Sequence, residues 1–453
     1  MSAVRRGYAL LAAVMSVVAV ACGAIFVAVG TGGAPVRTAA GRHHTAATAE
    51  AGTVWTGTWS ASPAEPGPVL RGGPARSVRN VVHTSIGGTH ARITLTNLYG
   101  KRALRVHAVS LAVRARGADA VPGTLRRVTF AGRAHATLPP GTDLVSDAVA
   151  LPVPSDGDLL VTLHVPAGAP VTRHPIARQT SYAADGDHTA DVDGAAYTEP
   201  VHTWQHLAAV DVVNPAARGA VVVFGDSITD GAGSTHDTNR RWPDLLADRL
   251  RDHGYAVLNQ GIGGNRVLRH GKGPSGLSRL ERDALGRSGV RAVVIGLGIN
   301  DILRAPHETD ARRITDGLTA LTRRAHARGL RVAGATLMPF GGRRPELEAV
   351  RQEVNAIIRA GGVFDEVVDF DRALRDPYAP DRLLPAYDSG DGLHPNDAGY
   401  RRMARSLDLT DLRAGRRGSS GHRAPAEGAT GVAGGARTVV AGASWQERRD
   451  GSA

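Results

Sequence analysis

Two short loops of the sequence hold the three residue types that together can turn a hydroxyl group into a nucleophile. Ser227 follows a glycine and an aspartate, and Asp391 precedes His394 by three residues. A serine hydroxyl is a poor nucleophile until a neighbouring base takes its proton, and a neutral imidazole can be that base near neutral pH. A carboxylate three residues before the imidazole can reach Nδ1 within one turn and fix the tautomer. We therefore predict that Ser227 is a nucleophile, His394 its general base and Asp391 the residue that orients His394.

Acyl transfer by a serine also needs hydrogen-bond donors that receive the negative charge of the tetrahedral intermediate. The backbone N–H of Ser227 is one candidate, because a strand-to-helix turn leaves the first N–H groups of a helix unpaired. A glycine in the loop Asn259–Asn265 could offer a second N–H, since glycine permits close approach and unusual backbone angles. The side-chain amide of Asn300 could be a third donor.

The loops that carry these residues follow apolar runs typical of buried parallel strands. From residue 219 to residue 412, such runs alternate with segments of helical period, which indicates a parallel sheet with helices on both faces. Strands are predicted at residues 221–224, 256–258, 292–297, 332–337 and 366–369, and helices at residues 242–250, 277–285, 311–328, 344–359 and 397–407. Ligands of such folds bind beyond the carboxyl ends of the strands, so these loops should meet at one edge. We predict a three-layer α/β/α domain.

Residues 53–215 have a different pattern. Short runs rich in β-branched residues recur at residues 90–97, 104–113, 124–130, 143–153 and 158–165, separated by clusters of turn-forming residues. Some of these runs alternate apolar and polar residues, as half-buried antiparallel strands do. The pattern predicts a β-sandwich domain that precedes the α/β domain.

Both ends of the chain differ from these regions. Arg5 and Arg6 precede an apolar run over residues 8–29, and a linker rich in glycine, alanine and threonine follows. This order is that of a secretory signal sequence, and the run is also long enough to anchor the chain in a membrane. We expect residues 1–52 to be a signal peptide or membrane anchor plus linker, and the chain to be extracellular or held at the outer face of the cytoplasmic membrane. Residues 413–453 have the composition of a disordered tail.

Composition argues against several classes of protein. The formal net charge is +12, but only 4% of the residues are aromatic and no basic recognition motif occurs, so no nucleic-acid partner is expected. The single cysteine, Cys22, lies in the N-terminal apolar run, which excludes a thiolate metal site in the folded part. We interpret His83, His90, His174 and His188 as exposed or structural, because they lack a compact metal-ligand spacing. No metal or other cofactor is expected.

The four loops together resemble the four sequence blocks of the SGNH/GDSL hydrolase superfamily. The similar segments are, in order, Phe224–Ser227, Asn259–Asn265, Gly298–Asp301 and Asp391–Pro395. The resemblance implies a flavodoxin-like hydrolase domain over residues 219–412, with Ser227, Gly264 and Asn300 as the oxyanion donors. Gly263 is the alternative to Gly264 if the second block is aligned one residue earlier. Ile228 stands where the four-letter family name has leucine, which exchanges one apolar residue for another.

Asp226, next to Ser227, and Asp301, next to Asn300, are interpreted as supporting residues. Asp226 is expected to bond loop amides, and Asp301 to support the residues that contact the substrate. Taken singly, each candidate has a plainer interpretation, since Ser227 could be a helix N-cap, Asn300 a turn former and His394 a surface residue. Four matching loops in order along one predicted sheet edge make such a coincidence improbable.

Further segments resemble a bacterial subgroup similar to xylanase-associated acetyl and aryl esterases. These segments are Arg240–Asp244, Gly334–Phe340, Val368–Asp371, Ser85–Gly88 and Val128–Phe130. The resemblance implies an exported serine esterase that hydrolyses short-chain acyl esters, acetyl esters above all, on a polysaccharide or a small molecule. The alternatives are a lipase or arylesterase with the same residues, and a non-catalytic carbohydrate-binding surface protein. Glycosidase chemistry by paired carboxylates ranks below these, because it leaves Ser227 and the oxyanion donors without a role.

Overall fold

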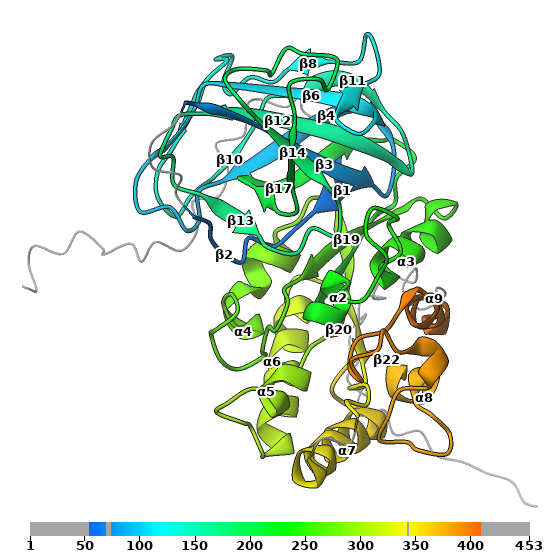
Figure 1. Ribbon diagram of the computed structural model, residues 1–453. Coiled ribbons are helices and arrows are strands. Elements are labelled where there is room, and N and C mark those ends of the chain that lie inside the picture. The colour runs from blue at the N-terminus through cyan, green and yellow to red at the C-terminus, as the bar shows by residue number, and fades with distance from the viewer. Residues whose placement is uncertain (1–53, 69–73, 342–343, 409–453) are drawn as a thin grey trace, which may run out of the picture. The chain divides into compact units, whose positions relative to one another are not determined.

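The computed structural model describes residues 54–68, 74–341 and 344–408 (Figure 1). The segments expected to be a signal or anchor (1–52) and a disordered tail (413–453) lie outside the described residues. Within the described ranges, no helix combines the length and the apolar character that crossing a membrane requires.

A parallel sheet forms the centre of the C-terminal region. Its strands are β18 (Gly219–Gly225), β19 (Tyr255–Gly261), β20 (Val290–Gly296), β21 (Arg331–Ala335) and β22 (Glu366–Val368). They lie side by side in the order β19-β18-β20-β21-β22, which is the flavodoxin-like order 2-1-3-4-5. β18 is buried along its whole length, because it is a central strand that is covered on both faces.

Helices cover both faces of this sheet. They are α2 (Ser227–Asp230), α3 (Trp242–Arg251), α4 (Gly276–Leu280), the π-helical turn η1 (Glu281–Leu285), α5 (Ile299–Leu303), α6 (Ala311–His326), α7 (Pro345–Ala360), α8 (Phe370–Leu374), the 3-10 turn η2 (Pro385–Tyr387) and α9 (Asp397–Ser406). Helices α3, α8 and α9 pack on the face that holds Val221 and Val223. Helices α4, α6 and α7 pack on the face that holds Val222 and Phe224. The predicted three-layer α/β/α fold is therefore confirmed.

Two large and two small antiparallel sheets form the N-terminal region. Its strands are β1 (Trp55–Ser60), β2 (Glu65–Pro66), β3 (Arg76–Thr84), β4 (Gly88–Thr96), β5 (Leu104–Val106), β6 (Ala108–Arg116), β7 (Asp119–Ala120), β8 (Arg126–Arg127), β9 (Ala136–Leu138), β10 (Asp143–Val145), β11 (Val149–Val153), β12 (Gly157–Val165), β13 (Thr172–His174), β14 (Ser181–Asp185), β15 (Glu199–Val201), β16 (Trp204–Gln205) and β17 (Leu207–Val213). One large sheet contains β1, β17, β4, β10 and β11, and the other is built around β14, β3, β12 and β6. The small sheets are β16-β13-β2 and β5-β9. Ile93 and Leu95 of the first sheet share a core with Leu159 and Val161 of the second, as in a sandwich.

Several strands of this region are shorter than the sequence predicts. The run 143–153 divides into β10 and β11 at Ser146, whose hydroxyl accepts the N–H of Ile93 in place of a backbone carbonyl. The run 124–130 is reduced to β8, because Asp147 accepts the N–H groups of Ala131 and Gly132 and turns the chain there. Side-chain hydrogen bonds of this kind compete with a strand ladder and leave no trace in hydrophobic periodicity.

The N-terminal and C-terminal regions pack directly on each other. Strand β1 lies against β19, and the backbone N–H of Gly57 donates to the carbonyl of Ser288 at 2.9 Å. A Cβ atom at Gly57 would lie 2.8 Å from Cδ1 of Leu258, so the close approach requires glycine. Trp59 and Trp204 of the β region belong to the same apolar cluster as Val222 of the parallel sheet. The two regions therefore share a core.

Candidate active site

Ser227 is the first residue of helix α2 and follows the end of β18. Asp226 occupies the helix N-cap, where its carboxylate accepts a hydrogen bond from the N–H of Ile228 at 3.1 Å. Gly231 ends this short helix with a φ of 104°, an angle that glycine adopts without strain. The Ser227 hydroxyl is thus held at the carboxyl end of the sheet, and its backbone N–H lies outside the helical hydrogen-bond ladder.

His394 lies in the loop that leads into α9. Asn396 caps α9 with its side-chain oxygen, and its amide nitrogen donates to the carbonyl of Asp388 at 3.0 Å. The Asp388 carboxylate accepts the backbone N–H of Gly392 at 3.1 Å, and the N–H of Ser389 donates to the His394 carbonyl at 2.9 Å. The loop is therefore fixed on both sides of the imidazole.

The structure brings Ser227, His394 and Asp391 together in one hydrogen-bonded chain. Nε2 of His394 lies 2.9 Å from the Ser227 hydroxyl oxygen, and Nδ1 lies 2.5 Å from an Asp391 carboxylate oxygen. With Nδ1 donating to Asp391, Nε2 is left to accept the serine proton. The other Asp391 oxygen accepts the N–H groups of Leu393 and His394. Burial opposes ionisation of Asp391, but the hydrogen bonds from His394 and the loop amides outweigh it and hold the pKa of this carboxyl below its usual value.

Gly264 occupies a tight turn after β19. The N–H of Asn265 donates to the carbonyl of Ile262 at 3.0 Å, and Gly264 has a φ of 75°, which strongly favours glycine at that position of a turn. The N–H of Gly263 is engaged, because it donates to the Asp230 carboxylate at 2.9 Å. Of the two glycines that the sequence leaves as oxyanion candidates, the geometry therefore favours Gly264.

The side-chain amide of Asn300 is held with its nitrogen free. Asn300 is buried at the start of α5, and its amide oxygen accepts Nε of Arg304 at 3.3 Å. Its Nδ2 lies near the Asp226 carboxyl but has no hydrogen-bond partner of good geometry among the described residues. Nη2 of Arg304 would lie 2.6 Å from a Cβ at Gly264, so this guanidinium packs against Gly264 as well as bonding Asn300. A buried donor without a partner is rare and favours a role in binding a transient acceptor.

The two aspartates expected to support the site both lie behind it. The Asp301 carboxylate accepts the N–H groups of Val267 and Leu268 at 2.7 and 3.0 Å, and so holds the chain that follows Gly264. Burial raises the pKa of Asp301, although these amide bonds lower it. Burial also raises the pKa of Asp226 to about 7 against the opposing bond from Ile228. The contacts agree with supporting positions, and the roles of both residues stay predictions.

Three contributors to this geometry were missed at the sequence level: Asp230, Arg304 and Arg279. Asp230 holds the Gly263 amide, and Arg304 orients Asn300, as described above. Arg279 is buried under the site and donates to backbone carbonyls at the ends of β18 and β19. Asp230 is an acidic residue one helical turn after Ser227, and Arg304 and Arg279 are two arginines of an arginine-rich chain. None of them gives a distinctive signal in the sequence.

Three of the histidines singled out in the β region bond separate aspartates rather than gather around a common point. His83 is half-buried and bonds Asp158 at 2.8 Å, His188 bonds Asp191 at 2.7 Å, and His174 is buried against Asp230. Among the described residues, no three histidine, cysteine, aspartate or glutamate side chains lie close enough together to hold a metal ion.

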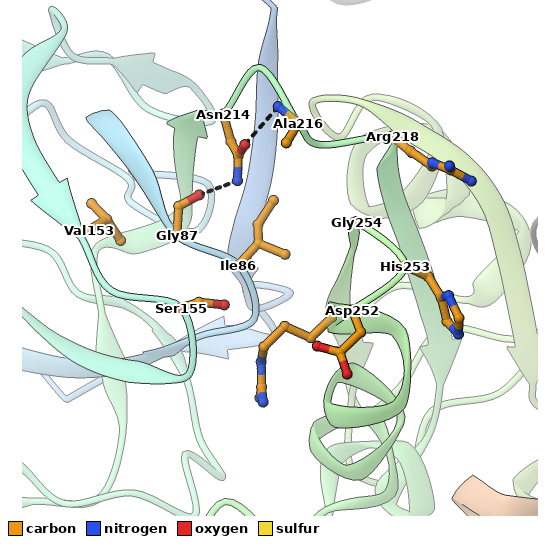
Figure 2. Close-up of a pocket in the computed structure, with 11 residues that line it drawn as sticks. Ile86, Gly87, Val153, Ser155, Asn214, Ala216, Arg218, Asp252, His253 and Gly254 are labelled. Carbon is orange, nitrogen blue, oxygen red and sulfur yellow. Dashed lines mark hydrogen bonds between the residues drawn. The ribbon is translucent and has the colours of Figure 1, made fainter.

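A cavity of about 650 Å³ lies at the other edge of the parallel sheet (Figure 2). It is lined by Arg218 and Gly254, which directly precede β18 and β19, and by Ile86 and Ser155 of the β region. Asn214 spans one wall, donating to the carbonyl of Gly87 and accepting the N–H of Ala216, both at 2.9 Å (Figure 2). Because the cavity adjoins the amino ends of the strands, it is separate from the Ser227 site.

Comparison with known proteins identifies the region that carries the site. Residues 223–402 match the model of the GDSL-like lipase/acylhydrolase family. No curated protein of known function matches the chain.

Solved structures similar to this region include three described hydrolases. A carbohydrate acetylesterase from Sinorhizobium meliloti is 19% identical, with 41% of this chain and 95% of that chain covered and a TM-score of 0.34. An acetyl xylan esterase is 25% identical, with 41% and 96% covered and a TM-score of 0.33. A member of the lipolytic protein G-D-S-L family from Veillonella parvula is 21% identical, with 41% and 94% covered and a TM-score of 0.32.

The family match spans the sheet, the Ser227 turn and the His394 loop, which are the elements that assemble the hydrogen-bonded chain. Residues 223–402 therefore carry a GDSL-like lipase/acylhydrolase domain, which supports the SGNH/GDSL superfamily for this part of the chain.

Proposed function

We propose that this chain is a serine esterase in which Ser227 is the nucleophile, His394 the general base and Asp391 the residue that orients His394. The observation that carries the proposal is the continuous chain of hydrogen bonds from hydroxyl to imidazole to carboxylate, 2.9 and 2.5 Å long, inside an acylhydrolase domain. A non-catalytic carbohydrate-binding protein would have no need for this alignment.

In the first half of the proposed reaction, Nε2 of His394 takes the proton of the Ser227 hydroxyl while its oxygen attacks the ester carbonyl carbon. The resulting oxyanion is received by the N–H groups of Ser227 and Gly264 and by Nδ2 of Asn300. The Asp391 carboxylate stabilises the imidazolium that forms. His394 then gives its proton to the departing alcohol oxygen, the carbon–oxygen bond breaks, and the acyl group remains on Ser227.

In the second half, a water molecule takes the place of the alcohol. His394 removes one proton from the water, whose oxygen attacks the acyl-enzyme carbonyl. The same three donors receive the second oxyanion. The bond to the Ser227 oxygen breaks, that oxygen regains the proton from His394, and the carboxylic acid leaves. The cycle requires only groups of this chain, the ester and water.

We further propose that the substrate is a short-chain acyl ester, an acetyl ester above all, on a carbohydrate. The support is twofold. Segments such as Arg240–Asp244 resemble those of acetyl and aryl esterases. The large hydrophobic residues that are exposed on the described surface are Val54, Val192 and Tyr378, which do not make the contiguous apolar face that binding to a lipid aggregate requires. A lipase or arylesterase with the same catalytic residues is the second candidate.

We also propose export, on the basis of the basic residues Arg5 and Arg6 and the apolar run over residues 8–29. Fractionation of producing cells tests this proposal. We expect the full chain in the membrane fraction, or a chain shortened at its N-terminus in the medium. Recovery of the uncleaved chain in the cytosol would contradict export.

The catalytic roles predict distinct losses of rate on p-nitrophenyl acetate. Ser227→Ala should lower kcat/KM by about 10⁴-fold or more, because no other group supplies the nucleophile. Asn300→Ala should lower kcat by roughly 10²- to 10³-fold with little change in KM, because its amide bonds the oxyanion and not the ground-state ester.

Labelling gives an independent readout of the same roles. A fluorophosphonate should label the wild-type chain and the control variant Ser278→Ala, which removes an exposed hydroxyl of α4, but not Ser227→Ala. Ester hydrolysis by Ser227→Ala at the wild-type rate would refute the assignment.

The substrate proposal predicts a preference for short acyl groups and for carbohydrate. We expect kcat/KM for p-nitrophenyl acetate to exceed that for p-nitrophenyl palmitate by at least about tenfold, because the described surface offers no broad apolar face for a long chain. The chain should also release acetate from acetylated xylan, measured against Ser227→Ala as the blank for spontaneous hydrolysis. Faster cleavage of the palmitate ester would favour the lipase alternative.

The pKa of Asp226, about 7 and raised mainly by burial, predicts a pH-dependent stability. Because this pKa lies above the unfolded value of 3.8, the folded chain binds an extra proton between the two values. The free energy of unfolding should therefore fall as the pH rises from 4 to 7. Asp226→Asn removes this fall. The unfolding free energy of the variant, relative to that of the wild type at the same pH, should therefore be higher at pH 8 than at pH 5 by about 2–3 kcal/mol.

Urea unfolding of the full chain at both pH values measures this difference. Asp147→Asn is the matched control, because bonds from Thr129 and two loop amides outweigh burial and lower the pKa of Asp147. Both pH values lie above the unfolded pKa of 3.8, so the stabilising contribution of Asp147 is present at both, and Asp147→Asn should lose nearly the same unfolding free energy at pH 5 and at pH 8. Equal effects of Asp226→Asn at pH 5 and pH 8 would show that Asp226 is ionised in the folded chain at both.

A further inference from the structure

A buried ion pair joins the β region to the helix that begins with Ser227. His174, at the end of β13, is 3% exposed, and Asp230, at the end of α2, is 2% exposed. Nε2 of His174 lies 2.8 Å from one Asp230 carboxylate oxygen. Nδ1 lies 2.9 Å from the carbonyl oxygen of Ser62.

The partners of His174 require both of its ring nitrogens to carry a proton. A backbone carbonyl and a carboxylate both accept hydrogen bonds, so Nδ1 and Nε2 must both donate. Burial by itself would lower the pKa of His174, but the charge and hydrogen bond of Asp230 outweigh it and the pKa is raised. The nearby cations are Arg241, which faces the same carboxylate, and Arg279, which bonds the Ser62 hydroxyl. The pair is therefore an imidazolium and a carboxylate.

The second oxygen of Asp230 reaches the oxyanion loop. It accepts the backbone N–H of Gly263 at 2.9 Å, next to the predicted oxyanion donor Gly264. Ile176, two residues after His174, covers the same glycine, because a Cβ atom at Gly263 would lie 2.8 Å from its Cδ1. The β region thus contacts the oxyanion loop by one polar and one apolar path.

We propose that His174 is a positioning residue of the esterase site: it holds the Asp230 carboxylate, and through it the Gly263 amide and the oxyanion loop. The inference rests on the proposed function for its effect on rate, and on the hydrogen bonds alone for its effect on the loop. It gives the β region a part in catalysis that does not depend on binding carbohydrate.

The chain of contacts distinguishes positioning from simple cohesion between the regions. A buried ion pair contributes little net stability compared with well-packed apolar side chains, because both charges lose their hydration. Cohesion alone would be served by the apolar core that the two regions already share. A carboxylate bonded on one side to His174 and on the other to the Gly263 amide instead fixes a backbone position. Displacement of a reacting group by about 1 Å can cost roughly 100-fold in rate.

Two substitutions separate the two ends of the imidazole. The amide nitrogen of glutamine lies near the position of Nε2, so His174→Gln can still donate to Asp230. The amide nitrogen of asparagine lies near the position of Nδ1, so His174→Asn keeps the bond to Ser62 and loses the bond to Asp230. His188→Gln is the matched control, because it loses the bond from Nδ1 of His188 to Asp191, a histidine–aspartate pair that lies within the β region.

The expected result is a selective loss of kcat in His174→Asn. For p-nitrophenyl acetate, kcat should fall by about 10- to 100-fold with KM changed by no more than about threefold. His174→Gln should recover most of this loss, and His188→Gln should match the wild type. Thermal unfolding of each variant identifies any that fail to fold. If His174→Asn does not fold, the single variant Asp230→Asn takes its place in the comparison with His174→Gln.

Amide hydrogen exchange provides a readout that needs no substrate. Exchange of residues 261–268 should be faster in His174→Asn than in the wild type or His174→Gln. If the wild type hydrolyses no ester but this difference is found, the positioning stands and the proposed function fails. If the wild type is active and His174→Asn alters neither kcat nor exchange in this segment, the positioning role is overturned while the proposed function stands.

Discussion

The rest of the site depends on the buried guanidinium of Arg279. It donates to the carbonyl oxygens of Gly225 and Gln260, at 2.8 and 2.9 Å, where β18 and β19 end. Carbonyl groups at buried strand ends need donors, and the sheet ladder no longer supplies them there. Ser227 follows the first of these carbonyls by two residues, and Gly264 follows the second by four. One cation therefore sets the separation between the proposed nucleophile and the proposed oxyanion loop.

A charge in this position carries a cost that its surroundings offset only in part. Burial lowers the pKa of Arg279 to about 10 in spite of the neighbouring Asp283 carboxylate, so the side chain is still charged at neutral pH. The guanidinium also stacks 3.9 Å above the Phe224 ring. Removal of either partner of the Arg279–Asp283 ion pair would leave an uncompensated buried charge. The same low dielectric raises the pKa of Asp226 and strengthens any bond to an oxyanion.

The sequence predicts what depends on short stretches of chain. Apolar runs such as Val221–Phe224 identify the parallel strands, and the three-residue spacing of Asp391 and His394 indicates their contact. Resemblance to family blocks points to Gly264 and Asn300, whose roles stay predictions. Contacts between distant segments carry no such signal. The sequence gives no signal for Arg304, and it indicates only an exposed or structural role for His174, because their roles depend on partners that only the fold brings near.

These long-range contacts bear on how the two regions relate. Ser62 bonds Arg279, His174 bonds Asp230, and Ile176 covers Gly263, so three side chains of the β region touch the back of the active-site loops. Strand β1 also packs on β19 through a glycine that leaves no room for a side chain. A shift of the β region would therefore move supports of both the nucleophile helix and the oxyanion loop at once. The β region therefore supports the active-site loops of the C-terminal region in addition to being linked to it.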